Sequence, residues 1–168
     1  MIIIFNGPLG IGKSTLAEAL TDSIDDCVML DGDHLVAANP PAKDQVEHLH
    51  STIACLVAHH RSFGYRHFVI DHLWCTPGEL VDLRRRLLAV DPEAAIHCFL
   101  LTLPPEENLR RIQRRQSARA LDMREFELRT VAEEREVLSR HGGELGTPFD
   151  VSAPPDVLVA ALRRQLSV

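Results

Sequence analysis

The segment at residues 7–14, Gly-Pro-Leu-Gly-Ile-Gly-Lys-Ser, constrains the fold of this chain more than any other feature. It has the spacing G-x-x-x-x-G-K-S, follows the apolar run Ile2–Phe5 and precedes a helical pattern. Glycines let the backbone curl so that successive N–H groups point at one anion, and the start of the next helix adds the positive end of its dipole. A strand, this loop and a helix, in that order, predict a phosphate-binding site.

The loop also predicts roles for its residues. We expect Lys13 to reach the β- and γ-phosphates of a nucleoside triphosphate, and the Ser14 hydroxyl to ligate Mg²⁺. A chance match in a glycine-containing turn is the alternative, and the flanking strand and helix argue against it. The residues expected to contact the nucleotide here are Gly7, Pro8, Leu9, Gly10, Ile11, Gly12, Lys13, Ser14 and Thr15.

Length and composition indicate one soluble domain over residues 1–168, since the chain is 45% hydrophobic and 25% charged. The first apolar run is too short for a membrane span and lacks the basic flank of a signal peptide. A net charge of −6 argues against a general nucleic-acid binder. Scattered cysteines without a C-x-x-C pair favour reduced thiols and a cytoplasmic protein. They are Cys27, Cys55, Cys75 and Cys98.

Strand-like and helix-like segments alternate along the chain, which predicts an α/β fold with a doubly wound, mostly parallel sheet. The predicted strands are Ile2–Phe5, Cys27–Leu30, His67–Asp71, His97–Leu103 and Pro148–Ser152. The predicted helices are Lys13–Ser23, Lys43–Phe63, Gly78–Val90, Pro105–Gln116, Met123–Arg140 and Asp156–Leu166. The glycine-rich segment 142–146 is expected to be a loop.

Two carboxylates follow the second predicted strand, in Leu30-Asp31-Gly32-Asp33-His34. Ligands of open α/β sheets bind beyond the carboxyl ends of the strands, so Asp31 and Asp33 are candidate site residues. If the extended geometry continues, both lie on one face; one would help hold Mg²⁺ while the other accepts a proton from an attacking hydroxyl. His34 is placed for substrate contact. A turn with helix-capping aspartates is the alternative.

The third predicted strand also ends in an acid, Asp71. This pattern is typical of a Walker-B carboxylate near the metal or its waters, and it is equally compatible with contact to the acceptor substrate. Trp74 is the only tryptophan and follows the same strand. It could line an acceptor pocket or pack as a rim residue. Asp71 and Trp74 are therefore candidate substrate-binding residues.

Arginines are concentrated near residues 110–119, within ten residues that contain no acid. On a helix, one polar face is shared by Arg110, Arg111, Arg114 and Arg115. A solvated basic face is the simple explanation. Because phosphoryl transfer requires cations around the transferring group, we instead expect Arg111, Arg115 or Arg119 to act there.

With these residues in view, the chain resembles the small P-loop kinases, a group that includes shikimate, gluconate, adenylylsulfate and nucleoside or nucleotide kinases. The segment Asn6–Ser14 is similar to the loop of tunicamycin-resistance-type proteins, and Leu30–Asp33 to the acidic motif of adenylylsulfate and shikimate kinases. Gly64–Asp71 resembles the third-strand segment of chloramphenicol phosphotransferase, and Arg111–Arg119 resembles a lid region.

The resemblance covers nearly the whole chain and implies a single-domain P-loop NTPase fold. It implies a five-stranded sheet of order 2-3-1-4-5, with helices on both faces and a short lid at about residues 110–125 that closes over ATP. It further implies that Asp33 acts as base or substrate anchor and that Asp31 lies near the metal. A lid arginine and the segment around Pro154 would hold the adenine.

These observations together predict an enzyme that moves the γ-phosphoryl group of Mg·ATP to a hydroxyl of a small molecule such as an antibiotic, a sugar or a metabolite. A nucleoside or nucleotide kinase is one alternative, because a phosphorylated acceptor would draw on the surplus arginines. An ATP-binding regulatory module without phosphotransfer is another. A polynucleotide kinase is disfavoured by the acidic net charge and by the 5% aromatic content.

Overall fold

In the computed structural model, residues 1–115 and 121–168 are described, with side chains for all of these except 115 and 121–124. Five strands form one parallel sheet in the order β2-β3-β1-β4-β5. This confirms the predicted sheet and the strand order that the resemblance implies. The strands are β1 (Ile2–Asn6), β2 (Cys27–Asp31), β3 (His67–His72), β4 (Ile96–Thr102) and β5 (Thr147–Asp150).

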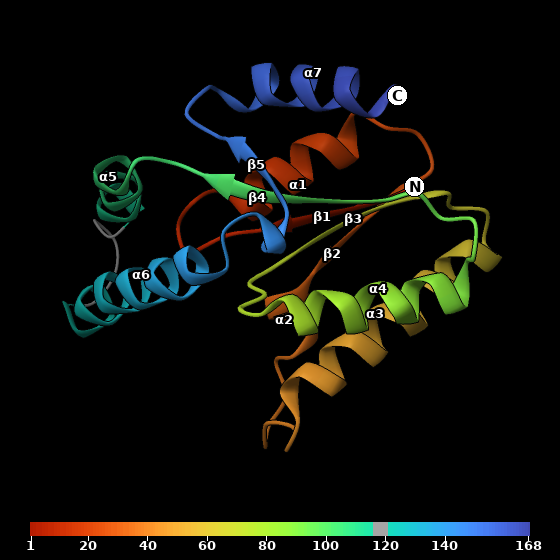
Figure 1. The fold of residues 1–168 in the computed structure, drawn as a ribbon, viewed down its shortest axis with the longest axis horizontal. Coiled ribbons are helices and arrows are strands. Elements are labelled where there is room, and N and C mark those ends of the chain that lie inside the picture. Colours follow the sequence, from red (N-terminus) through yellow and green to blue (C-terminus); the bar gives the residue numbers. More distant parts are fainter. Residues whose placement is uncertain (116–120) are drawn as a thin grey trace.

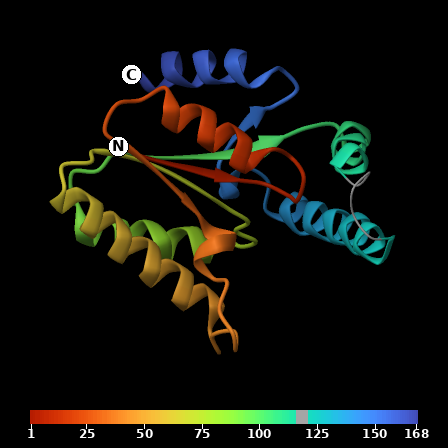
Figure 2. The same cartoon turned by 180° about the vertical axis from the view of Figure 1, so that it is seen from behind.

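Helices cover both faces of the sheet, as expected. α1 and α7 lie on one face, α3 and α4 lie on the other, and α5 and α6 lie beyond the carboxyl ends of the strands (Figures 1 and 2). The helices are α1 (Lys13–Asp22), α2 (Gly32–Leu35), α3 (Gln45–Ser62), α4 (Pro77–Val90), α5 (Pro105–Arg115), α6 (Leu121–His141) and α7 (Pro155–Leu166). The expected lid falls on the junction of α5 and α6, and its residues 116–120 lie outside the described part of the chain.

The central strand β1 shows why this sequence forms a covered sheet. Alternate side chains of a strand point to opposite faces. Ile2 and Ile4 belong to the core under α3 and α4, whereas Ile3 and Phe5 belong to the core under α1 and α7. All four side chains are fully buried. A continuous apolar run is therefore required here, in place of the alternating pattern of a half-exposed strand.

The chain departs from the predicted elements at two places. After β2 it does not stay extended: Asp31 is the N-cap of the short helix α2, so the prediction that Asp31 and Asp33 share an extended face is wrong. The segment expected to be a loop contains the 3₁₀-helix η2 (Gly142–Leu145), whose Leu145 is fully buried. Gly146 follows with φ +131°, where a Cβ would lie 2.8 Å from the Leu100 nitrogen.

The sequence also yields predictions about the cysteines and about membrane spans. The four cysteines form no disulfide in the structure. Among the described helices, none is long and apolar enough to cross a membrane.

The core under α4 yields a stability prediction. We expect Leu83→Ala to lower the free energy of unfolding by about 2–5 kcal/mol, because it opens a cavity around a fully buried side chain. Val81 is 66% exposed on the same helix, so Val81→Ala is the matched control and should change stability by about 0.5 kcal/mol or less. Urea titration of both variants measures the difference, and equal losses would contradict this account of the core.

Candidate active site

The phosphate-binding loop joins β1 to α1 at the carboxyl edge of the sheet. Gly10 and Gly12 adopt φ values of +73° and +105°, which favour glycine. A Cβ on Gly10 would overlap the side chain of Ile112, so the loop also packs closely against α5. Gly12 is the N-cap of α1, and no side chain caps that end of the helix. Backbone N–H groups therefore converge here, as an anion site requires.

Lys13 lies across this loop. Its Nζ donates to the carbonyl oxygens of Gly7, at 2.8 Å, and Pro8, at 3.3 Å. Burial lowers the pKa of Lys13, while the carboxylates of Asp33 and Glu134 oppose that shift. The ammonium group thus lies in a partly desolvated position among acidic groups, where its attraction for a phosphate is stronger than in open water.

Ser14 and Asp71 form a hydrogen-bonded pair beside the loop. The Ser14 hydroxyl donates to Asp71 Oδ2 at 2.8 Å, and Asp71 is only 2% exposed. Burial raises the pKa of Asp71 to about 6, with the nearby charges of Asp31 and Asp33 adding to the shift. Asp71 Oδ1 is buried and has no hydrogen-bond partner. A buried carboxylate oxygen without a partner beside a hydroxyl is suited to a hard cation.

Asp31 lies beside this pair but is engaged differently. It is opposite Asp71 in the β2–β3 register. Its Oδ1 accepts from the N–H groups of Asp33 at 2.9 Å and His34 at 3.2 Å, and its Oδ2 lies 3.0 Å from His34 Nδ1. The capping alternative is therefore the one observed, and the carboxylate bound to Ser14 is that of Asp71. The contacts of His34 are with Asp31, and its side chain is 86% exposed.

Asp33 stands at the open side of the site, where its side chain is 74% exposed. His72 Nδ1 lies 2.8 Å from Asp33 Oδ1, and this hydrogen bond is the main reason why the pKa of Asp33 is lowered. A Cβ on Gly32 would come within 2.7 Å of His72, so the glycine is what lets His72 approach α2. This contact engages one of the two carboxylate oxygens of Asp33.

Arg111 reaches from α5 to the phosphate-binding loop. It donates to the carbonyl oxygens of Ile11 at 3.1 Å and Val151 at 2.8 Å. It lines a cavity of about 250 Å³ between the loop, α5 and the start of α7. Pro154 is the N-cap of α7, and its neighbours Ala153 and Pro155 line the same cavity. Two backbone carbonyls thus hold Arg111 at the wall of this cavity. The other two predicted arginines cannot be placed, because the side chain of Arg115 and all of Arg119 lie outside the described part of the chain.

Three residues of α5 and α6 that the sequence analysis did not single out contact the loop or support it. Glu134 Oε2 accepts from the Leu9 N–H at 2.5 Å, and Asn108 Nδ2 donates to the Leu9 carbonyl at 3.1 Å. Arg135 donates in turn to Asn108 Oδ1 at 3.2 Å. Burial raises the pKa of Glu134. The carboxylate of Glu134 therefore accepts from one of the loop N–H groups that would otherwise face a phosphate.

A second cavity, of about 210 Å³, lies beside His72, between α3 and the segment that follows β3. Trp74 lines it and is only 1% exposed; its indole N–H donates to His50 Nε2 at 3.1 Å. The Trp74 backbone is held by Asn6, which accepts from its N–H at 2.9 Å and donates to its carbonyl at 3.0 Å. Trp74 is therefore a core residue that also forms a wall of this cavity.

The residues at the end of β3 and the start of α1 fit Mg²⁺. Magnesium is commonly bound by one or two protein oxygens together with substrate phosphates and water. Ser14 and Asp71 supply a hydroxyl and a carboxylate side by side. No group of three or more His, Cys, Asp or Glu side chains placed to hold a metal occurs among the residues that the structure describes.

Comparisons with known proteins agree with this architecture. A family model described as an AAA domain matches residues 2–141. No curated protein matches the sequence. The tunicamycin resistance protein of Deinococcus radiodurans is similar in structure, with a TM-score of 0.67 and 18% identity over 99% of this chain and 95% of that chain.

Two named kinases are similar to the same extent. A gluconokinase from Sinorhizobium meliloti 1021 has a TM-score of 0.65 and 18% identity, covering 98% of this chain and 94% of its own. The shikimate kinase from Bacteroides thetaiotaomicron has a TM-score of 0.64 and 16% identity, covering 100% of this chain and 99% of its own. These likenesses confirm the P-loop fold and the resemblance to small P-loop kinases.

The burial of Asp71 yields a prediction about pH. Because its pKa in the folded state is about 6 rather than the ordinary 3.8, stability is lost as the pH rises from about 4 to about 6. Asp71→Asn removes the ionisable group and can still accept from Ser14. We expect the variant to gain on the order of 2 kcal/mol in free energy of unfolding at pH 7.

Urea unfolding of both proteins between about pH 4 and pH 7 measures this difference. The advantage of Asp71→Asn should be small at the acid end, grow toward pH 6 and then stay constant. Asp25→Asn, at an exposed position, is the control. A pH-independent difference would contradict the raised pKa.

Proposed function

Because the chain belongs to the AAA domain family and has the fold of the small P-loop kinases, we propose that it transfers the γ-phosphoryl group of Mg·ATP to a hydroxyl of a small molecule. One observation carries the proposal: Lys13, the Ser14–Asp71 pair and the Asp33–His72 pair meet at the same edge of the sheet. A nucleotide-binding module needs the first two groups, whereas an exposed carboxylate beside them is what a hydroxyl acceptor requires.

The nucleotide would lie along the loop with its phosphates on the backbone N–H groups of residues 7–15. Its base would enter the cavity lined by Thr15, Arg111 and Ala153, next to Pro154. Arg111 is then a base-side residue held by the Ile11 and Val151 carbonyls, in place of the predicted role over the transferring phosphoryl group. That role would pass to the predicted Arg115 and Arg119.

Ser14 and Asp71 would hold the magnesium ion, with Asp31 a nearby negative charge beside Asp71. When bound there, the ion neutralises charge on the β- and γ-phosphates. Asp71 must be ionised to serve as a ligand. Since burial raises its pKa to about 6, it is mostly ionised at pH 7, and a cation beside it would favour that form further.

Asp33 would orient the acceptor hydroxyl and take its proton. The acceptor oxygen forms the new bond to the γ-phosphorus as the bond from that phosphorus to the β,γ-bridging oxygen breaks, and ADP leaves with the electron pair. His72 holds one oxygen of Asp33, so the other can accept the hydroxyl proton. Lys13 would stabilise the charge that develops on the β,γ-bridging side.

The two roles separate in a pair of variants. We expect Asp33→Asn to bind ATP as the wild type does and to lose about 10²–10⁴-fold in turnover, because only the proton acceptor is removed. Lys13→Ala should instead weaken ATP binding by about 10–100-fold, through loss of a charge-assisted contact. Calorimetry and an ADP-release assay with a screen of hydroxylated acceptors measure the two quantities. Full turnover in Asp33→Asn would remove Asp33 from the reaction.

Replacing Glu134 is expected to strengthen ATP binding rather than weaken it. Its carboxylate accepts from the Leu9 N–H, so it competes with an incoming phosphate. Replacing it with glutamine should tighten ATP binding by about 5-fold, since about 1 kcal/mol of like-charge repulsion is removed. Glu133→Gln removes the same charge from the adjacent, exposed position of α6 and is the control. Weaker ATP binding in Glu134→Gln than in Glu133→Gln would show that Glu134 assists the nucleotide.

A further inference from the structure

We infer that the phosphoryl acceptor is an uncharged alcohol with an apolar body, bound in the cavity beside His72. The inference rests on the proposed function and names the substrate class of the same site. It separates this chain from kinases whose acceptor carries a phosphate or a carboxylate. The argument depends on where the cavity lies, what lines it and how its charges are paired.

The cavity opens next to the expected proton acceptor. His72 lines the cavity and also lies 2.8 Å from Asp33 Oδ1. Only the side chain of His72 therefore separates this part of the cavity wall from Asp33. The volume of about 210 Å³ corresponds to about seven liquid waters, which is room for a compact group and leaves larger parts of a molecule outside.

Most of the cavity wall is apolar. Val36, Val46, Leu49, Leu73 and Trp74 line it. Such a wall favours apolar parts of a ligand, and the polar side chains that line the cavity are Gln45, His50, His72 and Glu79. Neither lysine nor arginine occurs among the described residues that line this cavity. A phosphate or carboxylate placed here would lack the lysine or arginine that normally accompanies it.

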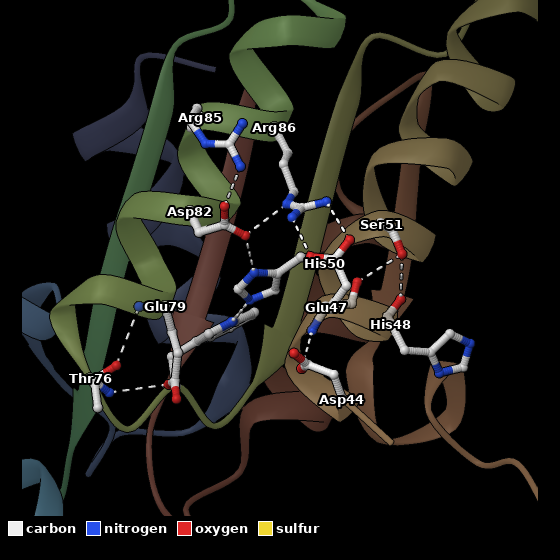
Figure 3. Close-up of polar contacts among 11 residues, drawn as sticks. Asp44, Glu47, His48, His50, Ser51, Thr76, Glu79, Asp82, Arg85 and Arg86 are labelled. Atoms are coloured by element: carbon white, nitrogen blue, oxygen red, sulfur yellow. Dashed lines mark hydrogen bonds and ion pairs between the residues drawn. The ribbon is translucent and has the colours of Figure 1, made fainter. Parts of the chain in front are cut away.

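His50 could supply a positive charge only if both of its ring nitrogens carried protons. The indole N–H of Trp74 is a donor only, so the His50 Nε2 that receives it carries no proton. The other nitrogen, Nδ1, lies 2.9 Å from Asp82 Oδ2 and holds the single ring proton (Figure 3). His50 is fully buried, and these two contacts engage both of its ring nitrogens, so neither nitrogen is left to bind an anion in the cavity.

The arginines nearest this network are engaged with carboxylates on α3 and α4. Arg86 donates from Nε to Asp82 at 2.7 Å and from its terminal nitrogens to both oxygens of Glu47 (Figure 3). Arg85 donates to the remaining oxygen of Asp82. These guanidinium groups are balanced by carboxylates and are not among the lining residues.

The charge that does lie near the cavity is negative. Glu79 lines it, and one carboxylate oxygen accepts from the N–H groups of Cys75 at 2.7 Å and Thr76 at 3.1 Å. Asp33 lies on the far side of His72. Acidic groups on both sides and an apolar wall between them disfavour an anionic acceptor. A neutral hydroxyl compound meets no such penalty.

The direct test compares related acceptors with and without an anionic group. Each set contains a neutral alcohol and a related carboxylate or monophosphate that keeps free hydroxyls, for example glucose with gluconate and a nucleoside with its 5′-monophosphate, together with more apolar alcohols. ADP release is measured with Mg·ATP, and binding is measured by calorimetry with a non-hydrolysable ATP analogue. We expect kcat/KM for the neutral member to exceed that of its anionic partner by about 100-fold, the equivalent of about 2.7 kcal/mol.

A pair of variants tests the location. Val46→Arg places a cation at the 40%-exposed rim of the cavity, and Val81→Arg places one at a 66%-exposed position of α4 away from it. Val46→Arg should raise KM for the neutral acceptor and narrow the gap between neutral and anionic members, with KM for ATP unchanged. Val81→Arg should leave all three quantities as in the wild type.

The possible outcomes separate the two proposals. An anionic acceptor used better than its neutral partner overturns the inference and leaves the phosphotransfer proposal standing. If Val46→Arg and Val81→Arg change KM for the acceptors equally, the acceptor does not bind in the cavity beside His72. If no compound releases ADP although ATP binds, the proposed function fails. The calorimetric preference then decides the inference: tighter binding of neutral compounds supports it, and tighter binding of anions overturns it.

Discussion

The hydrogen bond from Ser14 to Asp71 is the contact on which the arrangement of the site depends. It links the start of the helix α1, just after the phosphate loop, to the end of the strand β3. The strand before the loop, β1, pairs directly with β3 in the sheet. Because the carboxyl ends of parallel strands meet at one edge, everything that follows β2 and β3 is brought beside the loop. Asp31, Asp33 and His72 reach the site in this way, and each adds a charge or a proton partner close to the same carboxylate.

Much of the fold could be predicted from the sequence because its signals are local. The loop motif, the apolar run of β1 and the alternation of helices and strands each depend on neighbouring residues, and the resemblance to small P-loop kinases supplied the strand order that local patterns do not contain. The short helix α2 was not predicted, because Asp31-Gly32-Asp33 is compatible with both an extended segment and a capped turn. The observed choice places His72 against Gly32, a contact between residues forty positions apart.

The site was predictable to the extent that its residues lie in motifs. Lys13, Ser14, Asp33 and Asp71 do, and the structure brings them together. Glu134 lies in the acidic run Glu133–Glu136, and nothing in that spacing indicates which carboxylate faces the loop. His50 is one of several histidines on α3, and only its contacts with Trp74 and Asp82 distinguish it. Such roles come from packing between elements distant in sequence.

Asn6 precedes the phosphate loop directly, and its buried amide joins the backbone of Trp74 to that of Leu145. The last residue of the central strand thus anchors the acceptor wall and the segment before β5 as well as the loop itself. The proposed donor and acceptor subsites would consequently share one buried anchor, and their spacing would be established during folding rather than by either ligand. Alignment of the reacting atoms would then depend on the sheet rather than on the helices around it.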